Sequence, residues 1–126
     1  MQFYLTHNQT ENLQIWKKQF SKVNCGAIGG GFTYYFLVEN GVVIDKFVEF
    51  FKGGIWRPNN TIEDLSTVEM NFEITESQMA RANAWINTQQ LSIVTYRFIP
   101  TTMGTTFCVA SKDGRKIDLS DYDNWG

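Results

Sequence analysis

One histidine and two cysteines are the side chains best suited to nucleophilic or metal chemistry: His7, Cys25 and Cys108. A cysteine hydrolase holds a base within hydrogen-bond reach of the thiol and orients that base with a third group. His7 and Cys108 form the candidate catalytic pair for such an enzyme, an amidase or a thioesterase. Their neighbours favour a simpler interpretation, because Cys108 lies between Phe107 and Val109, where a thiol behaves as a small buried apolar group.

Metal and cofactor chemistry is not expected from this sequence. One histidine and two cysteines that lie far apart provide no ligand spacing for zinc. The glycine-rich stretch 26–31 lacks the Gly-Lys-Ser/Thr ending of a phosphate-binding loop and leads into a predicted strand. Carboxylates such as Asp45 and Glu49 fall on the polar face of a strand, where solvated charges belong. We therefore expect no metal and no cofactor.

Composition limits the class of protein. The chain has 126 residues, of which 43% are hydrophobic, and this predicts one domain with a real core over 1–126. The formal net charge of −2 provides no field that would attract nucleic acid or a membrane surface. No apolar run reaches the roughly 18 residues of a membrane span. Without a recognisable signal peptide, we expect a cytoplasmic protein with reduced thiols.

Two stretches carry helical patterns. The first predicted helix spans Thr10–Val23, because Leu13, Trp16 and Phe20 recur every three or four residues on one face. Asn8 or Thr10 can cap its start, Asn8 with Glu11 three residues later. The second spans Thr75–Gln89 and begins with Thr75-Glu76-Ser77-Gln78, the pattern of a capping box.

The remaining stretches carry strand patterns. Asn40-Gly41 is the strongest short-range hairpin signal and separates the predicted strands Phe32–Glu39 and Val42–Phe51. Further strands are predicted at Met1–Thr6, Val68–Ile74 and Ser92–Ile99, the last one ended by Pro100. The stretch Thr105–Leu119 is consistent with a hairpin or with a short helix. The expected fold is α+β, an antiparallel sheet of about five or six strands with two main helices packed on it.

Aromatic residues near the predicted loops are the candidate binding residues. Trp, Tyr and Arg dominate the energetics of protein interfaces, because they bury a large rigid area and keep a polar group. On this ground we select Trp56, Arg57, Tyr34 and Trp125 as the binding residues. A protein partner is therefore expected, with an oligomeric state that the sequence leaves open.

The order of several motifs carries a family resemblance. Gly30-Gly31-Phe32-Thr33 comes ahead of the Asn40-Gly41 turn, and Ile74-Thr75-Glu76-Ser77-Gln78 opens a predicted helix. Tyr96 follows, and Met103-Gly104-Thr105-Thr106-Phe107 comes last. This order resembles the permuted papain-like hydrolases, relatives of NlpC/P60 amidases and lecithin:retinol acyltransferases. The resemblance implies a papain-like fold, a base histidine on the first segment and a nucleophilic cysteine at the start of a helix on the last.

This sequence departs from the family at both reactive positions. The expected histidine falls near Gly31 and the expected cysteine falls on Gly104. Glycine can neither take a proton nor attack a carbonyl, so the resemblance implies a non-catalytic relative, a protein-interaction module. The cysteine hydrolase that uses His7 and Cys108 is the enzymatic alternative, and an inhibitor or immunity-type protein is the third. The chain also resembles, in general character, accessory proteins of T-even-type bacteriophages, which implies a host factor as partner.

Overall fold

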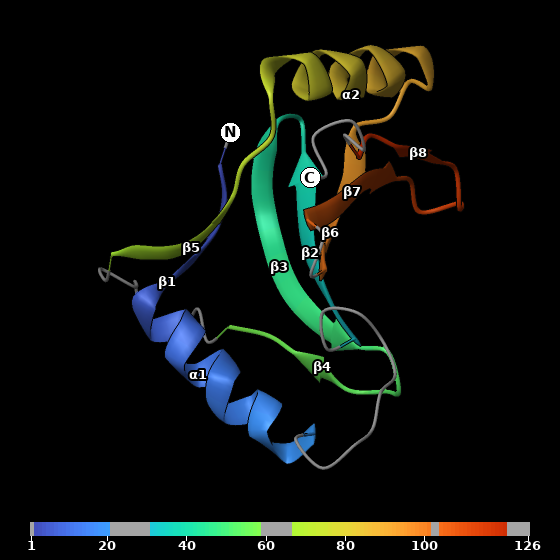
Figure 1. Ribbon diagram of the computed structural model, residues 1–126. Coiled ribbons are helices and arrows are strands. Elements are labelled where there is room, and N and C mark those ends of the chain that lie inside the picture. The colour runs from blue at the N-terminus through green and yellow to red at the C-terminus, as the bar shows by residue number, and fades with distance from the viewer. Residues whose placement is uncertain (1, 21–30, 59–66, 102–103, 121–126) are drawn as a thin grey trace.

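The computed structural model describes residues 2–20, 31–58, 67–101 and 104–120. The elements in these ranges (Figure 1) follow one another as β1 (Phe3–Thr6), α1 (His7–Lys17), the 3-10 helix η1 (Lys18–Phe20), β2 (Phe32–Glu39), β3 (Val42–Phe50), β4 (Ile55–Trp56), β5 (Val68–Phe72), α2 (Glu76–Thr88), β6 (Ile93–Thr101), β7 (Gly104–Ala110) and β8 (Lys116–Asp118). The predicted α+β class is confirmed. In the described part of the chain, neither α-helix has the length and apolar character that crossing a membrane requires.

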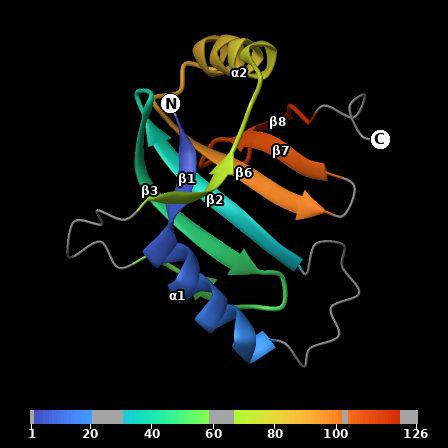
Figure 2. The same ribbon diagram turned by 60° about the vertical axis from the view of Figure 1, so that its left-hand side comes forward.

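The elements form two layers. One layer is a six-stranded sheet with the strand order β4-β3-β2-β6-β7-β8, and every pairing in it is antiparallel. The other layer holds α1, α2 and the antiparallel ribbon of β1 and β5. Figure 2 shows α1 and the ribbon in front of the sheet, with α2 at its upper end. We call the covered side of the sheet the inner face and the opposite side the outer face.

An aromatic cluster joins the two layers. Tyr96 and Phe98 of β6 and Phe36 of β2 point to the inner face and are almost fully buried. Phe3 of β1 packs on all three, with ring centroids at 4.6, 5.3 and 5.5 Å respectively. Aromatic pairs of this kind contribute about 0.5–1.5 kcal/mol each beyond the burial of their area. The short β1 is therefore held to the sheet by one deeply buried side chain.

The predicted hairpin forms at the predicted turn. Asn40 and Gly41 have φ values of 48° and 81°, and a type I′ turn requires positive φ at both central residues. Leu37 pairs with Asp45 and the next residue pairs with Val43, so Ile44 is an extra residue in β3. This bulge reverses the alternation of faces along β3. Because β4 pairs only with 48–49 of β3, residues 42–47 form an outer edge of the sheet.

The two helix starts compare differently with the sequence. The capping box of α2 is confirmed: the Gln78 amide donates to Thr75 Oγ1 at 3.0 Å, and the Thr75 amide donates to Gln78 Oε1 at 2.9 Å. The predicted start of the first helix is wrong, because α1 begins at His7 with a capping box between Thr6 and Gln9. The polar residues just after β1 are typical of a turn, so the sequence pattern did not indicate a helix cap at Thr6. Residues 21–23 of the predicted helix lie outside the described residues.

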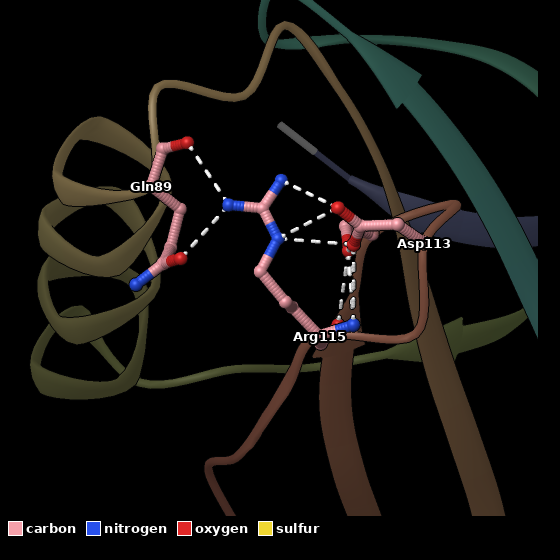
Figure 3. Close-up of polar contacts among 4 residues, drawn as sticks. Gln89, Asp113 and Arg115 are labelled. Carbon is pink, nitrogen blue, oxygen red and sulfur yellow. Dashed lines mark hydrogen bonds and ion pairs between the residues drawn. The ribbon is translucent and has the colours of Figure 1, made fainter.

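The stretch Thr105–Leu119, for which the sequence allowed a hairpin or a short helix, forms a hairpin. β7 pairs with β8, and a turn at 111–115 connects them. Arg115 forms an ion pair with Asp113 and donates to the backbone and side-chain oxygens of Gln89, at 3.3 and 2.9 Å (Figure 3). The turn is thereby attached to the end of α2.

The predicted end of the preceding strand at Pro100 is wrong, because β6 continues to Thr101. Pro100 has no amide hydrogen to donate. Its absence costs nothing here, because the pairing of β6 with β2 has already ended.

Two alanine substitutions in α1, one at a buried leucine and one at an exposed isoleucine, test how α1 packs on the sheet. Leu13 is fully buried, whereas Ile15 is 65% exposed. We expect Leu13→Ala to lower the free energy of unfolding by about 2–5 kcal/mol, because it leaves a cavity. Ile15→Ala is the control and should stay within about 0.5 kcal/mol of the unchanged protein. Urea denaturation measures both; equal effects would contradict the placement of α1 on the inner face.

Candidate functional site

A row of side chains crosses the outer face of the sheet. Strand residues alternate between faces, so the neighbours of the buried aromatic residues point outward. Tyr35 of β2 pairs with Phe47 of β3 on one side and with Arg97 of β6 on the other. Arg97 in turn pairs with Cys108 of β7, and Cys108 with Asp118 of β8. Five strands thus contribute one residue each to a continuous line, which we call the outer-face row.

At the β3 side of the row, two stacked aromatic rings lie between two arginines. The rings of Tyr35 and Phe47 stack with centroids 4.6 Å apart and an interplanar angle of 9°. Arg57, which follows β4, places its guanidinium 4.7 Å from the Phe47 ring centroid and pairs with Asp45 at 2.6 Å. Cation–π contacts contribute about 0.5–1 kcal/mol at exposed positions. The arrangement holds Arg57 in one orientation at the surface.

Hydrogen bonding and burial fix the centre of the row. The Tyr35 hydroxyl donates to Glu49 Oε1 at 3.1 Å. Partial burial and the adjacent Glu49 carboxylate raise the pKa of Tyr35, so the phenol stays neutral in the physiological range. Arg97 lies over the other side of Tyr35, with its guanidinium carbon 5.6 Å from the ring centroid. No described helix packs on this face.

The four predicted binding residues have different positions. Arg57 is exposed and belongs to the outer face. Trp56 and Tyr34 are 8% and 3% exposed on the inner face, so they do not present their side chains to a partner. The Tyr34 hydroxyl instead accepts a hydrogen bond from Lys17 Nζ at 2.7 Å, and burial raises its pKa to about 12. Trp125 lies outside the described residues.

His7 is engaged by two carboxylates. Its Nε2 lies 3.0 Å from Glu11 Oε1, and its Nδ1 lies 3.3 Å from Glu69 Oε2. The hydrogen bond with Glu69, followed by the charges of Glu11 and Glu69, raises the pKa of His7 above its ordinary value of 6.5. Both ring nitrogens therefore face carboxylates at the start of α1 rather than a thiol.

Cys108 lies on the other side of the sheet from His7. It is half-buried on the outer face, beside Arg97 and Asp118, while α1 packs on the inner face. Burial raises the pKa of the Cys108 thiol, against a smaller opposite effect of Arg97. The structure does not bring the candidate catalytic pair together, and it keeps the thiol protonated at neutral pH.

The two glycines at the expected reactive positions lie near the same end of the sheet, where β2 and β7 begin. Gly31 has φ +80°, and a Cβ there would collide with the ring of Phe51. Gly104 opens β7, a strand, whereas the resemblance implies the start of a helix at this position. Within the four described ranges, no group of three or more His, Cys, Asp or Glu residues could hold a metal ion.

Sequence reasoning missed Phe47 and Arg97 as site residues. Both lie inside strands that also carry many core residues, so sequence reasoning did not distinguish them from the core. The available signal was the alternation in β6, where Arg97 falls between two inward aromatic residues and must point outward. For Phe47 the bulge at Ile44 shifts the alternation, and its position could not be read from the sequence.

The only histidine of the chain permits a direct test of the His7 contacts. We expect an NMR titration of the imidazole to give a pKa above 6.5, and Glu69→Gln to lower it, with Glu73→Gln as the control. Because the pKa is raised by folding, the contacts stabilise the protein fully below pH 6.5, and this contribution is lost as the pH rises through the folded-state pKa. A midpoint at or below 6.5 would contradict the two contacts.

Comparisons with known proteins found no relative of this chain. No protein-family model, no curated protein and no solved structure matches the chain. The candidate site therefore rests on its own geometry: two stacked aromatic rings between two arginines on the outer face, and no assembled catalytic pair among the described residues.

Proposed function

We propose that this chain is a non-catalytic protein-interaction module that binds its partner through the outer face of the sheet. The contact centre is the stacked group of Tyr35, Phe47 and Arg57, together with Arg97. The single observation that carries the proposal is a pair of stacked rings between two arginines, on a face that no described helix covers. Tyr and Arg are enriched among the residues that dominate binding energy.

The rigidity of the group also supports the proposal. Arg57 is held by the Phe47 ring and by Asp45, and Tyr35 is held by Phe47 and Glu49. Side chains that are already ordered lose less conformational entropy when a partner binds. A preordered aromatic and cationic surface therefore converts more of its contact energy into affinity.

The resemblance to permuted papain-like hydrolases enters the proposal as a degenerate papain-like fold. In its favour are the order of the motifs and the two glycines near one end of the sheet. The strand at Gly104–Ala110 speaks against it, because the family has a helix start there. The likeness to T-even-type bacteriophage accessory proteins suggests a host factor as partner, and the binding mode does not depend on it.

Truncation of one arginine tests the proposed face. A tagged chain is used to capture proteins from the native host, and the affinity for the captured protein is then measured with Arg57→Ala and Arg81→Ala. We expect Arg57→Ala to weaken binding at least about tenfold, as the loss of an interface hot spot does. Arg81, an exposed arginine on α2, is the matched control and should leave the affinity unchanged. Absence of a partner, or equal effects of both changes, would sink the proposal.

The cysteine hydrolase is tested by the reactivity of Cys108. In a Cys25→Ser background, we expect slow alkylation by iodoacetamide at pH 7 and faster alkylation as the pH rises, because the raised pKa leaves at most roughly a few per cent of thiolate. A catalytic thiol would react rapidly at pH 7 and depend on His7. Rapid labelling that His7→Gln abolishes would revive the enzyme.

An inhibitor or immunity-type protein is a special case of the same binding mode. It differs only in the identity of the partner, which would be an enzyme that loses its activity when bound. Assay of the captured partner, with and without the chain, separates this case from a module that leaves its partner active.

A further inference from the structure

A hollow of about 400 Å³ opens on the outer face over β6, β7 and β8. Ligand-binding pockets commonly measure about 300–1,000 Å³, so this hollow has room for a small molecule. Its wall combines apolar side chains with two cations and one carboxylate. The residues that matter for binding are Arg97, Ile99, Thr106, Cys108, Lys116 and Asp118.

Arg97 is the unusual group in this wall. Its Nε atom is buried and has no hydrogen-bond partner. Within the described ranges no carboxylate forms an ion pair with it, and its contact is the face of the Tyr35 ring. A buried donor without a partner carries a free-energy cost, and the guanidinium fork matches a carboxylate in shape. The geometry leaves an arginine that contacts the Tyr35 ring and whose Nε has no partner among the described residues.

The charges around the hollow select the ligand. Arg97 and Lys116 are positive and Asp118 is negative, so these three groups sum to one positive charge at neutral pH. The Cys108 thiol adds no charge, because burial raises its pKa. A single positive charge complements a monoanion better than a phosphate dianion, which proteins usually hold with several amides or cations. Ile99 and Cys108 supply an apolar surface for the body of the ligand.

We propose that this hollow binds a small organic monoanion, a carboxylate on a compact apolar body, with Arg97 as the contact for the charged group. Arg97 also belongs to the proposed protein contact, but the other residues that line the hollow come from the Arg97 side of the sheet and do not include Tyr35, Phe47 or Arg57. The site therefore goes beyond the proposed protein-binding function and is tested without a protein partner.

Three probes separate the contributions of charge and apolar body. They are 3-phenylpropionate, its neutral amide 3-phenylpropionamide, and inorganic phosphate. Titration of each into the full-length ¹⁵N-labelled chain is followed by NMR. We expect 3-phenylpropionate to shift the amides of Thr106, Cys108 and Lys116 and to bind about tenfold more tightly than its amide, because only the acid forms a charge-assisted bond with Arg97. Phosphate, which lacks an apolar body, should leave these amides unchanged at the same concentration.

Two substitutions assign the charge contact. Arg97→Gln is expected to weaken the acid about tenfold, to the affinity of its amide, and to leave the amide unaffected. Arg81→Gln, at an exposed arginine of α2 that does not line the hollow, is the control and should change neither affinity. If Arg97→Gln disturbs the fold, Lys116→Gln replaces it and should weaken only the acid. Equal binding of acid and amide, insensitivity to both substitutions in the hollow, or shifts elsewhere would each overturn the proposal.

Discussion

The packing of Phe3 against Tyr96 and Phe98 is the contact on which the rest of the structure depends. It attaches the β1–β5 ribbon to the sheet and requires the aromatic residues of the central strands to point to the inner face. Because neighbouring strand residues point to opposite faces, this requirement sends Tyr35 and Arg97 outward. The outer-face row is therefore a geometric consequence of the core, and its alignment across five strands follows from the register of the antiparallel pairs.

The parts of the fold that local chemistry determines were predictable from the sequence. The turn at Asn40–Gly41 needs two residues that tolerate positive φ, and the cap at Thr75–Gln78 needs two side chains at fixed spacing, so each is visible in a few letters. The prediction of where α1 begins was wrong for the opposite reason. Its cap uses Thr6, the last residue of β1, and a residue that ends one element and caps the next gives no separate signal.

The candidate site was less predictable, because a site on a sheet depends on the pairing of strands that are distant in the sequence. Trp56 and Arg57 are adjacent in the chain, yet one enters the core and the other lies on the outer face. Choosing between them required the pairing of β4 with β3. Arg97 becomes conspicuous only when Tyr35 is known to lie beside it on the next strand.

The bulge at Ile44 has a consequence for association between copies of the chain. Residues 42–47 of β3 form a sheet edge that includes Val42, 62% exposed, and a regular apolar edge is a template for pairing with a second molecule. The bulge interrupts the repeat of backbone donors and acceptors, and Lys46 turns under the sheet to donate to the Tyr4 carbonyl at 3.1 Å. An irregular edge strand with an inward lysine pairs poorly with a regular strand of a second molecule. The same extra residue that precedes Phe47 thus makes this edge of the sheet a poor template for a second strand.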